Sequence, residues 1–292
     1  MKKLLFISLI MLSVVALCPS AYAATMAEKM SGSILLQVES KGEGWYVNPK
    51  TKSRHFLYRA PQAYQIMREQ GIGITNSDLQ KIPLGFYAIQ DVDSDRDGLS
   101  DSFEIAIGSN ISSSDTDNDG FNDLLEIIAG MNPNGGAISI DSSFAQHNDG
   151  KILLQVQAHG ESWWVNPADH KRYYLGRASD ALPLMRSFGI GISNTNIAMI
   201  PVSPTLMNCG DDFHCLGVAL KLGQFSYANV NGSTITLKQS GSAYIYDSRP
   251  QSSSTKTVCS FSNKTALLTY LDHTETGTVT ASESTRCSVV AR

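Results

Sequence analysis

An internal duplication is the feature of this 292-residue sequence that most constrains its fold. The fifty residues that begin ILLQVESKGEGWYVNP at Ile34 align without a gap onto the fifty that begin ILLQVQAHGESWWVNP at Ile152, with 25 identities. Self-similarity at a fixed offset is the signature of a repeated structural unit. We therefore expect two copies of one small module, residues 34–90 and 152–204, separated by sequence of a different kind.

Each copy predicts a small sheet covered by a helix. ILLQV, WYVNP and RHFL are β-prone runs between turn-forming residues, and the second copy repeats them as ILLQV, WWVNP and RYYL. Apolar residues then recur at helical spacing, as at Ala63, Ile66 and Met67, and Gly71 or Gly189 follows as a helix stop. The pattern leaves open whether the two copies fold singly or against each other.

The aromatic residues of the copies have two interpretations. Trp45 and Trp163 alternate in phase with Val47 and Val165, which predicts that both tryptophans pack beneath the helix. Their neighbours would then form a candidate ligand face on the other side of the sheet, consisting of Tyr46, Phe56, Trp164 and Tyr174. The alternative is that the two copies pack on each other and bury these same side chains.

The segment between the copies, residues 91–133, is strongly acidic. From Asp91 to Glu126 it holds nine aspartates, two glutamates and one cation, Arg96. About ten net negative charges in so short a stretch would repel one another unless something positive neutralised them. The rest of the chain carries no comparable charge, so the acidity indicates a local site, and nothing is basic enough to predict nucleic-acid binding.

Two twelve-residue stretches have the pattern of a calcium loop, DSDRDGLSDSFE from Asp93 and DTDNDGFNDLLE from Asp115. Carboxylates stand at positions 1, 3, 5 and 9, glycine at 6, a backbone carbonyl at 7 and glutamate at 12. We expect two calcium ions, because this oxygen-rich ligand set suits calcium better than magnesium. The predicted ligands are Asp93, Asp95, Asp97, Leu99, Asp101 and Glu104 in the first loop and Asp115, Asp117, Asp119, Phe121, Asp123 and Glu126 in the second. The alternative is a solvated acidic spacer.

The residues around the loops discriminate among calcium-binding families. Each loop is followed by a short helical segment that ends at Gly108 or Gly130, but SNISSS before the second loop is a poor entering helix, which disfavours an EF-hand sensor pair. DSDRDGLSDSFE, GSN, DTDNDGFNDLLE and GMNP together resemble the bacterial thrombospondin type 3 (TSP3) repeat. The resemblance implies that the acidic residues bind calcium and that the ions rigidify a connector between modules. Only two loops are present, and ISSSD replaces the usual proline-containing spacer. Glutamate at position 12 argues against a dockerin.

The amino terminus predicts export. Residues 1–23 combine two lysines, an apolar run from Leu4 to Leu17 and small residues around Tyr22, as in a cleaved signal peptide. The run is too short to span a membrane, so we expect no transmembrane segment after cleavage and a secreted or cell-surface protein. A lipid anchor on Cys18 is the alternative. GEGWYVNP and GIGITN also resemble a module of secreted bacterial proteins, which implies export and no particular activity.

Residues 134–151 are expected to be a linker, and residues 205–292 a separate α+β domain. A helix with Phe213 and Leu216 on its apolar face precedes runs that predict an antiparallel sheet: STITLKQ, SAYIYDS, KTVCSFS, ALLTYLD, TGTVTAS and TRCSVVA. In an exported chain the four cysteines of this region, Cys209, Cys215, Cys259 and Cys287, favour disulfides. Three connectivities are possible, and a zinc site at Cys209, His214 and Cys215 competes with them.

The sequence as a whole predicts a multidomain α+β protein of binding or structural function. It contains no HExxH, no GxSxG and no phosphate-cradling glycine loop, and its six histidines show no ligand spacing. We expect a non-enzymatic calcium-binding protein that serves adhesion or envelope association, with a cell-wall or surface polymer or another surface protein as partner. The alternative is an envelope hydrolase or hydrolase accessory with its activity in the last domain. The oligomeric state stays open.

Overall fold

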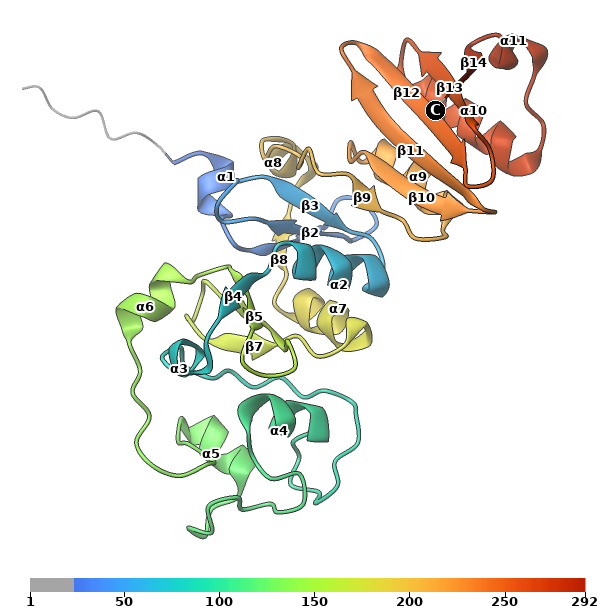
Figure 1. Cartoon of the computed structure of the whole chain (residues 1–292). Coiled ribbons are helices and arrows are strands. Elements are labelled where there is room, and N and C mark those ends of the chain that lie inside the picture. Colours follow the sequence, from blue (N-terminus) through green and yellow to red (C-terminus); the bar gives the residue numbers. More distant parts are fainter. Residues whose placement is uncertain (1–23, 292) are drawn as a thin grey trace, which may run out of the picture.

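The computed structural model describes residues 24–291 and has a mixed α+β architecture (Figure 1). The expected signal peptide, residues 1–23, lies outside the described residues. The first copy and its flanks contain α1 (Met26–Lys29), β1 (Ile34–Gln37), β2 (Glu43–Val47), β3 (Arg54–Leu57), α2 (Ala60–Glu69), β4 (Ile72–Ile74) and α3 (Asn76–Leu79). The acidic segment contains α4 (Asp101–Ile107) and α5 (Asp123–Ala129). The second copy and its flanks contain α6 (Ser142–His147), β5 (Ile152–Gln155), β6 (Ser162–Val165), β7 (Arg172–Tyr174), α7 (Ala178–Ser187), β8 (Ile190–Ile192) and α8 (Asn194–Ala198).

The two copies exchange a strand. The first sheet has the order β3-β2-β1-β8 and the second has the order β4-β5-β6-β7. β8 of the second copy runs parallel to β1 of the first, and β4 of the first copy runs parallel to β5 of the second. Each sheet therefore takes an edge strand from the other copy, and α2 packs beside α7 where the two halves meet (Figure 1). The copies fold together as one unit, which we call the double module.

The repeated GIGI sequence makes this exchange possible. A Cβ atom added to Gly71 would lie 2.6 Å from Leu154 Cγ, and one added to Gly189 would lie 2.6 Å from Leu36 Cγ. Because glycine has no Cβ, the exchanged strand can approach the central strand of the other copy closely. The helix α2 is capped one residue earlier, at Gln70. The main role of Gly71 is therefore close approach between the copies.

The hydrogen bonds between the copies are reciprocal, as the strand exchange is. Tyr46 Oη donates to the carbonyl oxygen of Gly150 over 2.9 Å, and the equivalent Trp164 Nε1 donates to the carbonyl oxygen of Gly32 over 3.2 Å. The two glycines lie against each other, since a Cβ added to Gly32 would come within 2.4 Å of Gly150 Cα. Polar tips of buried aromatic residues thus satisfy backbone carbonyls that would otherwise be orphaned.

The predicted aromatic ligand face is absent from this structure. Trp45 lies opposite Phe56 in the β2–β3 ladder and Trp163 lies opposite Tyr174 in the β6–β7 ladder. Directly opposite residues share a face of the sheet, so Phe56 and Tyr174 lie on the face opposite to that of Tyr46 and Trp164. Tyr46, Phe56 and Trp164 are buried and Tyr174 is partly buried. The alternative, mutual packing of the two copies, accounts for Tyr46 and Trp164.

The expectation that Trp163 packs beneath the helix of its own copy is also wrong. Trp164 is the residue on that side, with its ring 5.8 Å from that of Phe188 at the end of α7. Trp163 lies on the opposite face of the sheet, with its ring 6.4 Å from Phe103 of α4. A shift of one residue in strand register turns every side chain to the other face of the sheet. Because two aromatic residues are adjacent in each copy (WY and WW), the hydrophobic pattern is the same for either register.

The remaining residues form the carboxy-terminal domain. It contains β9 (Met207–Asn208), α9 (Phe213–Lys221), β10 (Ser226–Val230), β11 (Ser233–Ser240), β12 (Ala243–Pro250), β13 (Thr255–Phe261), α10 (Lys264–Thr276), α11 (Ala281–Ser284) and β14 (Cys287–Ala291). The sheet order is β14-β13-β12-β11-β10-β9, antiparallel except between β9 and β10. Helices α9 and α10 pack on one of its faces (Figure 1).

Two runs expected to be strands are not strands. ALLTYLD lies within α10, where Leu267, Tyr270 and Leu271 are buried on one helical face and Asn263 caps the first turn. TGTVTAS spans the end of α10, a loop and the start of α11. The spacing of three and four residues between the buried side chains is helical, although the β-branched threonines among them favour a strand.

The domain holds two disulfides, Cys209–Cys215 and Cys259–Cys287, which is one of the three possible connectivities. Both sulfur atoms of the competing zinc site are therefore used in a disulfide. Cys259 and Cys287 lie opposite each other on β13 and β14, so this bridge joins the edge strand of the sheet to its neighbour. Across residues 24–291, no helix combines the length and the apolar character needed to cross a membrane.

Candidate metal centre

The acidic segment forms a separate lobe, residues 91–133, which we call the acidic lobe (Figure 1). Its two loops curl so that the first three carboxylates of each converge. One oxygen from each of Asp93, Asp95 and Asp97 lies within 4.8 Å of the others, and the same holds for Asp115, Asp117 and Asp119. These are the residues that sequence position alone assigned to positions 1, 3 and 5.

The backbone of each loop is shaped by two residues with positive φ. At position 4 these are Arg96 (φ 64°) and Asn118 (φ 61°), and at position 6 they are Gly98 (φ 99°) and Gly120 (φ 97°). The turn directs backbone N–H groups at the first aspartate, since Gly98 N donates to Asp93 Oδ2 over 3.1 Å and Gly120 N donates to the equivalent oxygen of the second loop over 2.9 Å. These hydrogen bonds orient the first carboxylate of each loop.

Glu104 and Glu126, predicted as the last ligand of each loop, lie in the first turns of α4 and α5. Glu104 is 0% exposed and Glu126 is 2% exposed. Burial, followed by the surrounding aspartates, raises the pKa of each carboxyl to about 7. The Oε2 atom of each glutamate has no hydrogen-bond partner, and neither do Asp95 Oδ2 and Asp97 Oδ2 in the first loop.

Buried carboxylate oxygens without partners are costly unless a proton or a cation neutralises them. Here they belong to aspartates and glutamates that face one another, and no lysine or arginine forms an ion pair with them in the described residues. Calcium prefers a cage of carboxylate and carbonyl oxygens, with a bidentate glutamate as the last ligand. The residues present therefore fit calcium, and Glu104 and Glu126 are the groups that most need it.

The aspartates at position 9, predicted as ligands, are also hydrogen-bonded within their own loops. Both oxygens of Asp101 accept hydrogen bonds from Ser94, one from its backbone N–H and one from its hydroxyl, each over 2.8 Å. Asp123 accepts the same two bonds from Thr116, over 2.8 and 2.6 Å. These aspartates thus brace their own loops. Ser94 and Thr116 were missed by the sequence reasoning, and their signal was a hydroxyl residue at position 2 of both loops.

Asp123 also connects the two sites. It is fully buried and, although it belongs to the second loop, its charge contributes to raising the pKa of Asp95, Asp97 and Glu104 in the first. It contributes in the same way to the raised pKa of Glu126. The two loops therefore pack closely enough that neutralising one changes the electrostatic field at the other.

The short helices end where the sequence predicted. Gly108 and Gly130 adopt left-handed φ angles of 83° and 75° and cap α4 and α5. Of the apolar residues of α4 and α5, Phe103 and Ile127 are buried, whereas Ile105 and Ile128 are exposed. At position 7, Leu99 is buried and Phe121 is exposed, so only the first loop inserts its side chain into a core.

The acidic lobe docks on the second sheet through Phe103. Its ring lies 6.4 Å from Trp163, 5.9 Å from Tyr174 and 5.8 Å from Phe86. Leu99 and Ile127 belong to the same hydrophobic cluster, and Asp91 pairs with Arg177 over 3.2 Å at its edge. The lobe is not a connector that sets the separation of the two modules, as the TSP3 resemblance implied, because the modules pair directly through their exchanged strands.

Two segments of the acidic lobe match a known family. Residues 93–110 and 115–134 match the family model of the bacterial TSP3 repeat. The chain therefore contains two bacterial TSP3 repeats, a class of calcium-binding repeat, and the matched segments include every residue of the two loops. No curated protein and no solved structure matches the chain.

Proposed function

We propose that the protein binds two calcium ions, one in each TSP3 loop, and that the ions fix the acidic lobe on the double module. The observation that carries this proposal is the pair of buried glutamates, Glu104 and Glu126, each with an unpartnered oxygen and a pKa raised by burial and by aspartates of its own loop, beside two sets of three convergent aspartates. Each ion would be held by the first three aspartates of its loop and the glutamate. It would supply the positive charge that the lobe lacks.

The side chains around the ion perform the remaining work. Gly98 N and Gly120 N orient the first aspartate of each loop. The hydrogen bonds from Ser94 and Thr116 to the aspartate at position 9 hold the end of each loop where the helix begins. The glutamate lies on the first turn of a helix that also carries a core residue, Phe103 in α4 and Ile127 in α5. Closing the site therefore sets the position of Phe103 one residue away, and through it the contact with Trp163.

Calorimetric titration of calcium into the chelator-treated chain tests this proposal. We expect two ions per chain, one ion in Glu104→Gln and one in Glu126→Gln, because the amide keeps the shape of the side chain and loses its charge. Glu69→Gln, a change at an exposed glutamate on α2, is the matched control and should leave both ions bound. Full binding in both site variants would contradict the assignment, and affinities of about 0.1–1 mM would suit an extracellular module.

We further propose an extracellular, non-enzymatic role in surface attachment. Disulfides form in oxidising compartments, and the chain has two together with its TSP3 repeats. The rigid double module would present the terminal domain to a surface polymer or a surface protein. Calcium-dependent attachment to cell-wall material without its turnover would support this role. Release of soluble products that requires a residue of the terminal domain would favour a hydrolase instead.

A further inference from the structure

The sheet of the carboxy-terminal domain has an uncovered face with an unusual arrangement of charge. Tyr246 faces the helices, since its ring lies 5.2 Å from that of Tyr270 in α10. Successive strand residues alternate between faces, so Asp247 and Arg249 on β12 point to the opposite, uncovered side. In the β11–β12 ladder Thr234 lies opposite Arg249 and shares that side.

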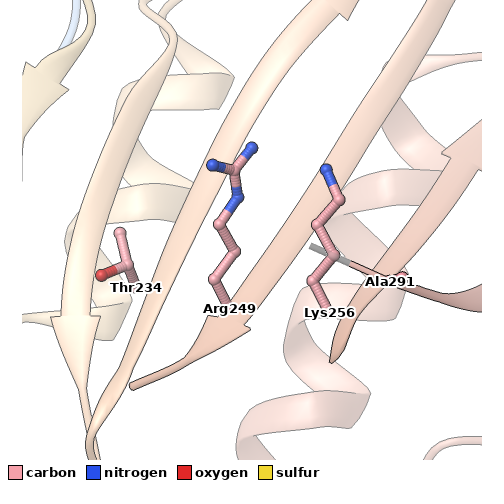
Figure 2. A pocket seen from close by; sticks show the side chains of 4 residues that line it. All are labelled: Thr234, Arg249, Lys256 and Ala291. Atoms are coloured by element: carbon pink, nitrogen blue, oxygen red, sulfur yellow. The ribbon is translucent and has the colours of Figure 1, made fainter. Parts of the chain in front are cut away.

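A cavity opens on this uncovered face. It has a volume of about 470 Å³ and is lined by Thr234, Arg249, Lys256 and Ala291. Figure 2 shows the Arg249 and Lys256 side chains rising side by side from neighbouring strands, with Thr234 next to Arg249. The volume falls within the range of small-ligand sites. Its polar lining consists of two cations and the Thr234 hydroxyl, which donates to Asn229 Oδ1 over 2.7 Å, so the two cations offer the hydrogen-bond donors to an acceptor-rich ligand.

A buried carboxylate holds these cations in place. Asp247 is only 1% exposed, and it accepts from Arg249 Nε over 3.0 Å and from Arg249 Nη2 over 2.9 Å. Lys256 Nζ lies 3.4 Å from the same carboxylate and Lys238 Nζ lies 4.0 Å from it. The Arg249 hydrogen bonds hold the pKa of Asp247 below its usual range, so this carboxylate stays charged.

The charges in this cluster do not cancel. One carboxylate neutralises one cation, so the three cations around Asp247 leave a local excess of two positive charges. A solvated lysine or arginine loses conformational freedom when it binds an anion. Here Asp247 has already restrained the two cations that line the cavity, so a ligand would bind with less of that loss.

We propose that this cavity is a binding site for an oxyanion of the phosphate or carboxylate class, held by Arg249 and Lys256, with Thr234 at its edge. The anion would be free or carried on an acidic surface polysaccharide. The site is independent of calcium, because no residue of the acidic lobe contributes to it. It gives the terminal domain a ligand chemistry of its own.

The test is a titration of the full chain in calcium-free buffer from which the chelator has been dialysed. The probes are inorganic phosphate, hyaluronate as a carboxylate polysaccharide and dextran as a neutral one. We expect phosphate or hyaluronate to bind and dextran not to bind. Binding of phosphate alone would identify a free anion, and much tighter binding of hyaluronate would identify the polymer. No binding of either anion would overturn the proposal.

Variants separate a built site from diffuse electrostatics. Lys256→Gln should weaken anion binding about tenfold, equivalent to about 1.4 kcal/mol, and Thr234→Val should change it little, because the Thr234 hydroxyl donates to Asn229. Lys238→Gln is the matched control, because it removes an equal charge from the same face outside the cavity lining. An equal loss in Lys238→Gln and Lys256→Gln would reduce the site to a general positive field and overturn it. Unchanged thermal unfolding and calcium binding in each variant would exclude misfolding.

Discussion

At the residue scale, Glu104 and Glu126 are the residues on which the proposed calcium sites depend most. Each is buried beside several aspartates and has a pKa of about 7. A buried carboxyl of this kind must carry a proton or meet a cation, since an unpaired buried charge is strongly unfavourable. In the proposed function, a calcium ion would supply the cation for each of them. This explains why the glutamates are placed inside the lobe and not on its surface.

His55 gives the double module a pH dependence of its own. Burial lowers the pKa of His55 to about 4, and its Nε2 atom has no hydrogen-bond partner. An unfolded histidine has a pKa of about 6.5. Between about pH 6.5 and pH 4 the unfolded chain therefore binds a proton at His55 that the folded chain does not bind. The free energy of unfolding should therefore fall by up to about 3 kcal/mol as pH falls from 6.5 to 4.

His55→Phe should remove this part of the pH dependence. Denaturant unfolding at saturating calcium, compared between pH 7 and pH 4.5, measures it. His147→Phe, at an exposed histidine of α6, is the control and should behave as the unmodified chain. An identical pH dependence in His55→Phe and the unmodified chain would show that His55 is protonated without cost in the folded state.

Substitution of two glycines with the same backbone angle distinguishes the cost of backbone strain from the cost of a steric clash between the copies. Gly32 and Gly42 both have φ of 75°, but a Cβ on Gly32 would meet Gly150 Cα at 2.4 Å and one on Gly42 would meet nothing within 4 Å. Gly42→Ala should cost about 1–2 kcal/mol, the ordinary penalty of a left-handed residue. Gly32→Ala should cost clearly more or prevent folding. Equal losses, measured by denaturant unfolding, would mean that the backbones move apart easily.

At the element scale, α4 joins the metal site to the double module. Glu104 closes the first site, and Phe103, its neighbour on the same helix, fills the space against Trp163 and Tyr174. Phe103→Ala should lower the free energy of unfolding of the calcium-loaded chain by about 3–5 kcal/mol, as for other buried aromatic truncations. Calcium stoichiometry should stay unchanged, because no ligand is removed.

Phe121→Ala is the matched control for this change. Phe121 holds a position in the second loop near its helix, but its side chain is 54% exposed. Its truncation should change the free energy of unfolding by no more than about 0.5 kcal/mol. Equal effects of Phe103→Ala and Phe121→Ala would show that the lobe does not dock through α4.

Elements with local signals were predictable from the sequence, and those that depend on long-range pairing were not. The loops, the stops at Gly108 and Gly130 and the helix α9 follow from residue types at short spacing. The strand exchange has no local signal, because ILLQ and GIGI occur in both copies and either pairing satisfies the pattern. The faces of Trp163 and Phe56 depended on register, and α10 was obscured by its threonines. The cavity at Arg249 was missed because its residues come from four separate strands.

At the scale of the whole molecule, the strand exchange predicts that neither copy is a stable monomer. A fragment of residues 24–90 would leave β1 without its parallel partner β8 and expose the surface around Tyr46. It should be unfolded or form a homodimer with itself, and it should gain structure when mixed with residues 140–204. Circular dichroism and sedimentation measure both properties. A folded monomer of either fragment would contradict the exchange.

Calcium should act on the lobe and leave the double module largely as it is. The modules are held together by exchanged strands, buried aromatics and the Arg172 guanidinium, which donates to the carbonyl oxygens of Leu79 and Ile82 in the other copy. None of these contacts involves the acidic lobe. Calcium at about a hundred times its dissociation constant would add about 2.7 kcal/mol per site to the stability of the lobe.

Hydrogen exchange of the backbone amides, measured with calcium and with chelator, tests directly whether the ions hold the acidic lobe in place. We expect amides of α4 and α5 to be protected with calcium and to exchange rapidly without it. Without calcium, amides around Trp163 should also lose part of their protection. Amides of α2 and α7 should keep their protection in both conditions. Equal protection of α4 and α5 with calcium and with chelator would contradict the claim that the ions hold the acidic lobe in place.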